Sequence, residues 1–247
     1  MKKRLDEILI RRGVIKDKNK AFIIITEGKV VVNGQKAVSP AQPVDEGAEI
    51  TVTSDKKYVG RGAYKLEAAL KDFKINVSGK ICLDIGSATG CFVEVLLNAG
   101  AKKVYAVDTA TGKLDIKLRE DPRVVVLEDT NILYLESLPE AVNLVTIDTS
   151  FTSLRLVLPV LGRFFSPLSE KSGGEVIALF KPQYETRNPK ILRHGIVKDG
   201  NEREKLLKDF VSWAGNNGWS VGKCIESPIK GSKGNTEYLV FLIQNAK

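Results

Sequence analysis

The stretch at residues 81–92, ICLDIGSATGCF, constrains the fold of this chain more than any other segment. An apolar run reaches the acid Asp84, and two glycines, Gly86 and Gly90, follow with only small residues between them. An amphipathic helical pattern then begins at Val93. This order predicts a strand, a tight loop and a helix, the first turn of an open α/β sheet, where ligands bind beyond the carboxyl ends of the strands. Glycine suits such a loop because it tolerates a positive φ and lets a ligand approach the backbone.

A second acid strengthens the case for a nucleoside ligand. The apolar run at residues 104–107 ends at Asp108, eighteen positions after Gly90. A carboxylate at this place can accept hydrogen bonds from both hydroxyls of a ribose. The glycine spacing does not match the Gly-x-Gly-x-x-Gly of dinucleotide-binding proteins. The alternative is a glycine turn in an ordinary α/β domain, with the acids acting as turn formers.

The charge of the chain is unevenly distributed. Residues 1–36 hold ten Lys and Arg against four Asp and Glu, whereas residues 37–247 hold 28 against 26. This basic excess predicts a polyanion partner, most often nucleic acid, and the alternative is a solvated basic face. The sequence has no export signal, no apolar run of membrane-spanning length and no Cys-x-x-Cys pair. We therefore expect a cytoplasmic protein without stable membrane association.

The first fifty residues predict a small α+β module. Apolar positions at helical spacing predict short helices over residues 3–12 and 18–26. Asn33-Gly34 is the strongest short hairpin signal, and residues 46–52 would form a closing strand. The side chains expected on the buried face of the second helix are Ala21, Phe22 and Ile25.

This module resembles the RNA-binding module shared by a small-subunit ribosomal protein, pseudouridine synthases and tyrosyl-tRNA synthetases. The residues that carry the resemblance are Arg4-Leu5-Asp6, Ala21, Gly28, Val30, Val32 and Asn33-Gly34. It implies that basic helix faces meet phosphates and RNA shape rather than base edges. The residues expected to bind RNA are Lys3, Arg4, Arg11, Arg12, Lys18 and Lys20 in this module, and Arg61 beyond it. The polar residues 54–57 predict the junction between an RNA-binding domain, 1–56, and a larger domain, 57–247.

The larger domain reads as a mostly parallel sheet that ends in an antiparallel pair. Further strands are expected at residues 124–127, 144–148 and 175–181, a helix at 202–213, and the final pair at 219–225 and 236–243. The predicted fold class is therefore α/β, with a Rossmann-like sheet behind a small α+β domain. After the third strand, Asp129 could contact an adenine amino group, and a plain turn is an equal alternative.

Four charged residues form a candidate catalytic set. Asp148 and Lys181 follow neighbouring strands at the same rim of the sheet as the glycine turn. Lys65 before the sheet and Glu237 in the last strand could complete the set. The order Lys, Asp, Lys, Glu matches the tetrad of ribose 2′-O-methyltransferases of the FtsJ type. The alternative for each residue is a surface charge or a strand-end turn.

The whole chain resembles the TlyA family, bacterial proteins described both as haemolysins and as FtsJ-like ribosomal RNA methyltransferases. The phrases that carry the resemblance are GRGAYKLEAAL, LDIGSATG, YAVD, IDTSFTSL, LFKPQYE, GIVKD and SPIKGSKGNTEYLVFL. The chain departs from the family at Ala63-Tyr64, at residues 109–111 and at Asp129.

The resemblance implies a class I methyltransferase that uses S-adenosylmethionine to methylate a ribose 2′-hydroxyl of ribosomal RNA or ribosomal subunits, with cytidine as the target. Lys181 would take the hydroxyl proton, Asp148 would orient Lys181, and Lys65 and Glu237 would position the ribose. A lysine can act as a base only when its pKa is lowered, which burial and a neighbouring cation both do. No metal is required, because the sulfonium supplies the electrophile. The implied cofactor-binding residues are Asp84, Gly86, Ser87, Gly90, Asp108 and Asp129.

Other functions stay open from sequence alone. A non-catalytic RNA-binding protein, a membrane-active haemolysin and a nicotinamide oxidoreductase are the alternatives, and the missing Gly-x-Gly-x-x-Gly disfavours the last. The single histidine, His194, has no cysteine or second histidine near it and is expected in a loop rather than at a metal. Lys230 and Lys233 could contact phosphate or lie in a solvated loop. The oligomeric state is not predicted.

Overall fold

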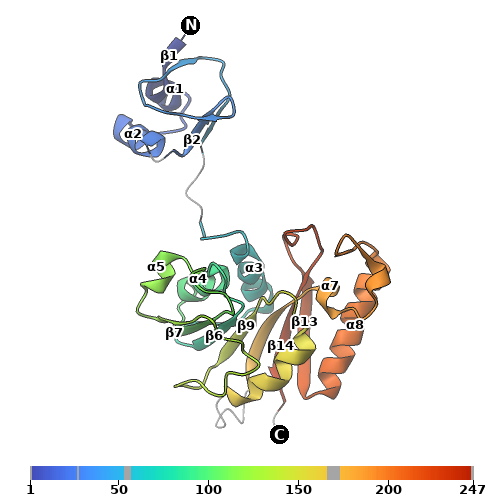
Figure 1. The fold of residues 1–247 in the computed structure, drawn as a ribbon. Helices are drawn as coiled ribbons and strands as arrows, with labels where there is room; N and C mark the ends of the chain where they lie inside the picture. The colour runs from blue at the N-terminus through green and yellow to red at the C-terminus, as the bar shows by residue number, and fades with distance from the viewer. Residues whose placement is uncertain (1, 27, 53–56, 166–172, 246–247) are drawn as a thin grey trace. The chain divides into compact units, whose positions relative to one another are not determined.

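The computed structural model describes residues 2–26, 28–52, 57–165 and 173–245. The chain divides into two compact units, Met1–Lys57 and Tyr58–Lys247 (Figure 1). The predicted junction at residues 54–57 lies, except for Lys57, outside the described residues.

The first unit is built from short elements around a small apolar core. Strand β2 (Val30–Val32) lies in the middle of a three-stranded sheet between β3 (Gln35–Lys36) and β5 (Ile50–Val52). The predicted hairpin is confirmed, because Val32 pairs with Gln35 and both Asn33 and Gly34 have positive φ. The other elements of this unit are β1 (Lys2–Arg4), α1 (Leu5–Arg11), α2 (Lys18–Thr26) and β4 (Pro43–Asp45).

Two expectations for the first unit were wrong. The first helix begins at Leu5 rather than at residue 3, because Lys3 pairs with Val44 in the antiparallel β1–β4 ladder. In α2, Ala21 and Ile25 are buried as predicted, but Phe22 is 58% exposed. Residues 21 and 25 are one helical turn apart and share a face, whereas residue 22 points about 100° away from that face.

The second unit contains a seven-stranded sheet of order β13-β14-β10-β9-β6-β7-β8. The pairs from β10 to β8 are parallel, and β14 runs antiparallel to both of its neighbours. This confirms the predicted fold class. The strand bounds are β6 Ile81–Ile85, β7 Lys103–Val107, β8 Val124–Leu127, β9 Leu144–Ile147, β10 Glu175–Phe180, β13 Trp219–Glu226 and β14 Tyr238–Gln244.

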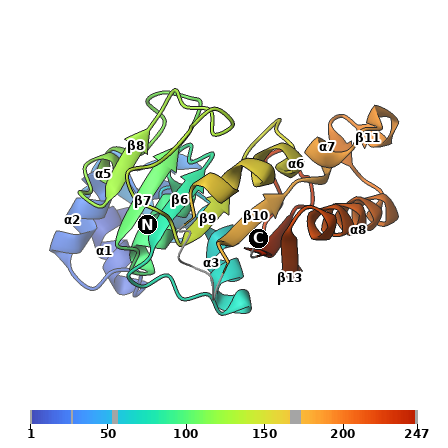
Figure 2. The ribbon, with the colours of Figure 1, turned by 90° about the horizontal axis from the view of Figure 1, so that it is seen from below.

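Helices cover both faces of this sheet (Figure 2). Helices α3 (Ala63–Phe73), α4 (Cys91–Asn98) and α5 (Ile116–Arg119) pack on one face. Helices α6 (Leu154–Val157) and α8 (Gly200–Asn216) and the 3-10 helix η1 (Leu158–Arg163) pack on the other. Strands that are buried on both faces consist of near-continuous apolar runs, so their positions could be predicted from the sequence.

Four short elements after β10 were not predicted. Helix α7 (Pro182–Glu185) follows Lys181 directly. The 3-10 helix η2 (Pro189–Ile191) leads into a two-stranded hairpin, β11 (Leu192–Arg193) and β12 (Ile196–Val197). His194 is exposed in the turn of this hairpin. The carboxyl ends of β6, β7, β9 and β10 meet at one rim of the sheet, and these elements stand at that rim.

Candidate active site

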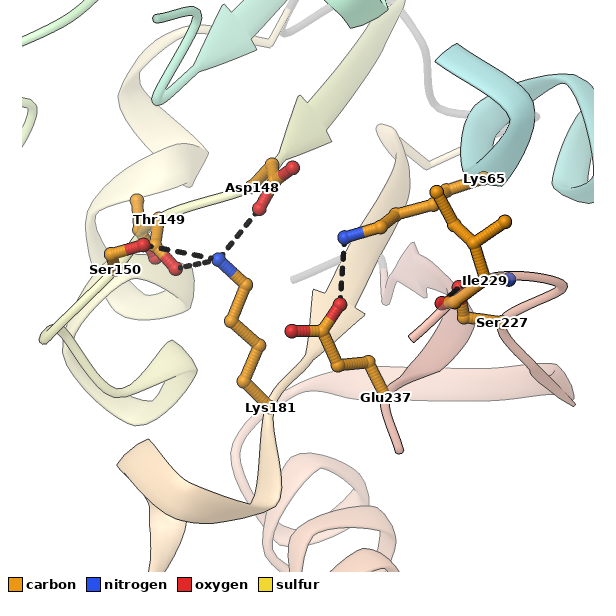
Figure 3. Close-up of polar contacts among 8 residues, drawn as sticks. All are labelled: Lys65, Asp148, Thr149, Ser150, Lys181, Ser227, Ile229 and Glu237. Carbon is orange, nitrogen blue, oxygen red and sulfur yellow. Dashed lines mark hydrogen bonds and ion pairs between the residues drawn. The ribbon is translucent and has the colours of Figure 1, made fainter. Parts of the chain in front are cut away.

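Lys181 lies at the end of β10, and its buried amine forms an ion pair with the partly exposed Asp148 at the end of β9. Its Nζ is 2.6 Å from Asp148 Oδ1 (Figure 3). The same Nζ donates to the Thr149 carbonyl at 2.7 Å and to Ser150 Oγ at 3.3 Å. Three acceptors therefore surround the amine, one for each N–H of an ammonium group.

Lys65 and Glu237 form a second buried pair beside the first (Figure 3). Lys65 is in the first turn of α3, and Glu237 precedes β14 by one residue. Lys65 Nζ donates to Glu237 Oε2 at 2.7 Å, and both side chains are at least nine-tenths buried. Gly231 packs so closely that an added Cβ would lie 2.3 Å from Glu237 Oε1, so the 231 backbone fixes the carboxylate.

The structure brings all four predicted catalytic residues to one cavity. Lys65, Asp148, Lys181 and Glu237 line a cavity of about 500 Å³ at the carboxyl rim of the sheet. Five of its lining residues also line a second cavity of about 330 Å³, next to β7. The shared residues are Gly86, Ala88, Asp148, Ser150 and Phe151. The site is therefore two chambers that meet at the glycine turn.

Gly86 is required at this junction by both conformation and space. Its φ is +82°, in the left-handed region that favours glycine. A Cβ at this position would lie 2.7 Å from the carbonyl oxygen of Asp148. Gly90 also has a positive φ, but its missing Cβ makes room for Leu114 and Leu118 beside α5. The structure thus gives Gly90 a packing role, and its predicted contact with the cofactor stays a prediction.

Asp84 is inside β6 and only 1% exposed. The Thr146 hydroxyl donates to its Oδ1 at 2.6 Å, whereas Oδ2 has no hydrogen-bond partner among the described residues. Burial raises the pKa of Asp84 to about 7, although the hydrogen bond from Thr146 acts in the opposite direction. Asp84 and Ser87 both border a small cavity that touches Gly86 and Asp148, and the Ser87 hydroxyl donates to the Asp84 carbonyl. An unpaired buried carboxylate oxygen at a cavity is a feature expected of a ligand site.

Asp108 follows β7 and lines the second chamber. Its Oδ2 accepts from the Ala88 N–H at 2.8 Å and its Oδ1 from the Ala110 N–H at 2.7 Å. These bonds hold the carboxylate in one orientation and leave lone pairs for a ligand diol.

Asp129, predicted in the adenine pocket, is not among the described residues that line this chamber. The chain turns at Asp129 with φ +51°, and Thr130 N–H donates to the Asp108 carbonyl at 3.0 Å. The lining residues at this place are instead Thr130, Asn131 and Ile132. The sequence signal was the polar cluster after the third strand, and the turn decides which of its members face the cavity.

Several further residues at the site were not predicted. Phe151 is 85% exposed, has φ +63°, lines both chambers and packs against Tyr184 with ring centroids 5.1 Å apart. The buried Glu185 accepts from Ser153 Oγ at 2.7 Å and thereby ties the loop after Asp148 to α7. Gln183 lines the catalytic cavity, and its Oε1 is buried without a partner in the described structure. The phrases IDTSFTSL and LFKPQYE contain these residues, but only the fold shows that they face each other.

Asn235 ties the β11–β12 hairpin to the catalytic cavity. It is 3% exposed, donates from Nδ2 to the Gly195 carbonyl at 3.1 Å and accepts from the Val197 N–H at 3.3 Å. It also lines the cavity and lies two residues before Glu237. Asn235 belongs to the sequence phrase GNTEYL, in which only Glu237 was predicted to be a site residue.

The candidate RNA-binding residues of the first unit divide into three groups. Lys3 and Arg11 both pair with Glu46, at 2.7 and 2.6 Å, and their hydrogen bonds lower the pKa of Glu46 to about 2. Arg12 donates to the carbonyls of Glu46 and Ala48, so these three cations gather at one turn. Arg4 pairs instead with Asp6 at 2.7 Å. Lys18 and Lys20 are exposed on α2, and within the described ranges their side chains have no ion-pair partner.

Comparison with known proteins identifies the family. Residues 58–244 match the FtsJ-like methyltransferase family, and residues 3–50 match the S4 domain. The chain belongs to the FtsJ-like methyltransferase family. This confirms the predicted resemblance and the prediction that the chain is a methyltransferase, and it assigns an S4 domain to the first unit of this FtsJ-like protein.

Relatives of this FtsJ-like methyltransferase cover nearly its whole length. The 16S/23S rRNA (cytidine-2′-O)-methyltransferase TlyA of Mycobacterium tuberculosis is 40% identical and covers 97% of this chain and 89% of that protein. Hemolysin A of Brachyspira hyodysenteriae is 38% identical and covers 97% of this chain and 99% of that protein. Among solved structures, a Streptococcus thermophilus protein named "putative hemolysin" is 37% identical, with a TM-score of 0.74 over 100% of this chain and 90% of that one.

Two further observations concern metals and membranes. The described residues contain no group of three or more His, Cys, Asp and Glu placed to hold a metal ion. Within the same described ranges, no helix has the length and apolar character needed to cross a bilayer.

Proposed function

We propose that this protein transfers a methyl group from S-adenosylmethionine to a ribose 2′-hydroxyl of ribosomal RNA, with cytidine as the target nucleotide. The observation that carries the proposal is that two lysine–carboxylate ion pairs, Lys181–Asp148 and Lys65–Glu237, lie at one cavity. That cavity joins the chamber that Asp108 lines. Related proteins named as rRNA cytidine-2′-O-methyltransferases support the choice of substrate.

We assign S-adenosylmethionine to the chamber beside β7 and the small cavity next to it. Asp108 in the chamber would hold the ribose hydroxyls, and the unpaired Oδ2 of Asp84 in the small cavity would accept a hydrogen bond from the amino group of the methionine part. Gly86 leaves the backbone open at the junction of the chambers. When bound, S-adenosylmethionine supplies an electrophilic methyl group on a sulfonium. The residues of the protein then have to deliver and deprotonate the hydroxyl.

Lys181 is the proposed base. A ribose hydroxyl is a poor nucleophile because its proton is tightly held at neutral pH, so a positioned proton acceptor is needed. All three N–H directions of Lys181 are occupied by Asp148, Thr149 and Ser150. To accept the proton, Lys181 has to be a neutral amine, with its lone pair in place of one of these three N–H groups. The longest of the contacts is that with Ser150, at 3.3 Å, and we place the lone pair and the incoming hydroxyl there. Asp148 would keep the amine aimed at the reacting oxygen.

Lys65 and Glu237 would hold the ribose for in-line transfer. Their contact at 2.7 Å leaves Glu237 Oε1 free to accept a hydrogen bond from a sugar hydroxyl. Because both groups are buried, the pair keeps its geometry before the substrate arrives, and such pre-orientation lowers the entropic cost of the reaction.

Phe151 and Tyr184 would form a platform for the target base. Phe151 is 85% exposed at the mouth of a cavity, and its backbone has a positive φ. Both features are unfavourable for a large aromatic residue and point to a functional role. A nucleotide turned out of its RNA stack presents a flat face that packs on such rings. The contact between the two rings fixes the platform next to Lys181, whose Nζ is 5.9 Å from the centre of the Tyr184 ring.

The test combines methylation mapping with cofactor binding. Ribosomal RNA from cells with and without the gene is compared for 2′-O-methylated riboses, and the purified protein is assayed on the unmethylated RNA. We expect one or a few riboses to depend on the gene, and Lys181→Ala to abolish transfer while S-adenosylmethionine still raises the melting temperature. Unchanged methylation together with full RNA binding would instead indicate a non-catalytic RNA-binding protein.

A further inference from the structure

A separate basic cavity lies beside the catalytic one. It measures about 270 Å³ and is bordered by Arg61, Gly62 and Lys65 at the start of α3 and by residues 229–232 before β14. Lys65, Gly231 and Ser232 line both this cavity and the catalytic one. The two spaces therefore open to each other next to Glu237.

The cavity carries positive charge that the protein itself does not neutralise. The side chains of Arg61 and Lys230 are exposed, and among the described residues neither has a hydrogen-bond or ion-pair partner. Lys65, by contrast, is paired with Glu237. Two unpaired cations that border one cavity are suited to an anionic ligand.

The loop that presents Lys230 is hydrogen-bonded to the segment that carries Asn235 and Glu237. The Ser227 hydroxyl donates to the Ile229 carbonyl at 2.7 Å (Figure 3), and Ser227 N–H donates to the Glu237 carbonyl at 2.8 Å. Gly231 N–H donates to the Asn235 carbonyl at 2.9 Å, and the Gly231 backbone rests against the Glu237 carboxylate. The position of Lys230 is thereby coupled to that of Glu237.

We propose that this cavity binds the RNA phosphodiester that adjoins the target ribose on its 3′ side. The inference rests on the proposed function and names a subsite of it. The 2′-oxygen and the 3′-phosphate are on neighbouring ribose carbons, so a hydroxyl at Lys181 and Glu237 brings its own phosphate within reach of an adjacent cavity. Arg61 can bind a phosphate through two parallel N–H groups, and Lys230 adds a point charge.

The subsite has two physical effects on the reaction. It fixes the ribose by a second point of attachment, which restricts its rotation in the catalytic cavity. It also places cations near a phosphate whose negative charge opposes the ionisation of the neighbouring hydroxyl. Binding at this cavity therefore favours both the position and the deprotonation of the nucleophile.

The first test measures RNA binding against salt with full-length protein. Arg61→Ala and Lys230→Ala are compared with Lys205→Ala, which removes an exposed lysine on α8 that lines none of these cavities. We expect each cavity variant to weaken binding of the unmethylated ribosomal RNA by about tenfold at low salt and to reduce the slope of log affinity against log salt by about one. S-adenosylmethionine binding and the melting temperature should match those of the control.

The second test addresses the phosphate directly. A short RNA around the mapped target carries an uncharged methylphosphonate in place of the 3′ phosphodiester. The unmodified protein should lose about tenfold in affinity on this RNA, and Arg61→Ala should lose little more, because both changes remove the same contact. Arg61→Lys should recover most of the salt slope.

Two outcomes would overturn the proposal, and both differ from failure of the proposed function. Full methyl transfer with cavity variants that behave like Lys205→Ala would reject the subsite and keep the enzyme. Equal effects of a methylphosphonate 3′ to the target and one several nucleotides away would show general charge attraction only. Absence of methyl transfer by the unmodified protein would instead reject the proposed function.

Discussion

Lys65 Nζ and Glu237 Oε2 are 2.7 Å apart although 172 positions separate these residues in the sequence. Lys65 comes from α3, which packs on one face of the sheet, and Glu237 precedes the antiparallel strand β14, the second strand from one edge of that sheet. The pair therefore forms only when the whole second unit has folded. The geometry of the site therefore depends on the folding of this unit.

Substitutions of this pair should affect stability and activity differently. Removing one partner leaves a buried unpaired charge, so Glu237→Ala should cost about 3–5 kcal/mol of stability and also most of the turnover. The double variant Lys65→Met with Glu237→Leu should regain much of the melting temperature, because apolar groups of similar volume replace the pair. Its methyl transfer should stay at background. A double variant with near-normal turnover would contradict the role given to the pair.

Lys181→Arg tests proton acceptance separately from charge. Arginine can keep the ion pair with Asp148, but a guanidinium stays protonated and cannot accept a proton. We expect methyl transfer to fall by at least about a thousandfold, in line with the loss of a general base, while the S-adenosylmethionine affinity changes little. Single-turnover assays with saturating cofactor measure the chemical step, and calorimetry measures the binding. A variant that retains a tenth of the activity would exclude Lys181 as the base.

Asp84 predicts a pH dependence of stability in the absence of ligand. Burial raises its pKa from 3.8 to about 7 in the folded protein, so the folded state holds a proton that the unfolded state has lost. The stabilisation is complete below about pH 4 and is lost as the pH rises through 7. Between pH 5 and pH 8 the protein should lose about 2–3 kcal/mol relative to Asp84→Asn. Denaturant unfolding at both pH values measures this, with the exposed Asp72→Asn as control.

Gly86 and Gly79 form a matched pair for testing the glycine turn. Both have a positive φ, +82° and +73°, so alanine strains the backbone at either position. At Gly79 a Cβ would meet no described atom within 4 Å, whereas at Gly86 it would lie 2.7 Å from the Asp148 carbonyl oxygen. Gly79→Ala should therefore lower the melting temperature only, while Gly86→Ala should also weaken cofactor binding and turnover by about a hundredfold or more. Similar activities for the two variants would reject this account.

Asn235 predicts a local change in backbone dynamics. Its amide accepts from the Val197 N–H and donates to the Gly195 carbonyl, so Asn235→Ala should release the β11–β12 hairpin. Hydrogen exchange should speed up at Val197, and turnover should fall by about tenfold, because the hairpin borders the catalytic cavity. Exchange in the centre of β6 should not change. Asn201→Ala, on the exposed start of α8, is the control.

The central sheet could be predicted because its strands are buried on both faces. Residues 103–107, 144–147 and 175–180 are mostly apolar, and each is followed by a charged residue at the rim. Parallel topology then placed Asp108, Asp148 and Lys181 at a common edge without any knowledge of side-chain directions. Lys65 and Glu237 lie outside this pattern, and they were predicted from the match to the FtsJ-type tetrad.

What could not be predicted depends on contacts between distant segments. The pairing of β1 with β4 is non-local, and the polar residues Lys2–Arg4 carry no strand pattern. The turn at Asp129 rotates Thr130 and Asn131 toward the chamber, which a polar cluster cannot reveal. The facing of Phe151 and Tyr184 depends on Glu185, which connects α7 to the loop before α6. Two-residue strands such as β11 are too short for any periodic signal.

The three acceptors around the Lys181 amine affect whether the cofactor can methylate this lysine. A free amine held beside a sulfonium would itself be a strong nucleophile and could be alkylated by its own cofactor. Asp148, Thr149 and Ser150 accept from all three N–H directions of this nitrogen, which is the arrangement of an ammonium group, and an ammonium has no lone pair to attack a methyl donor. In the proposed mechanism Lys181 has to lose a proton before it can act as the base, so these contacts shield it from irreversible self-modification until an RNA hydroxyl replaces one of them.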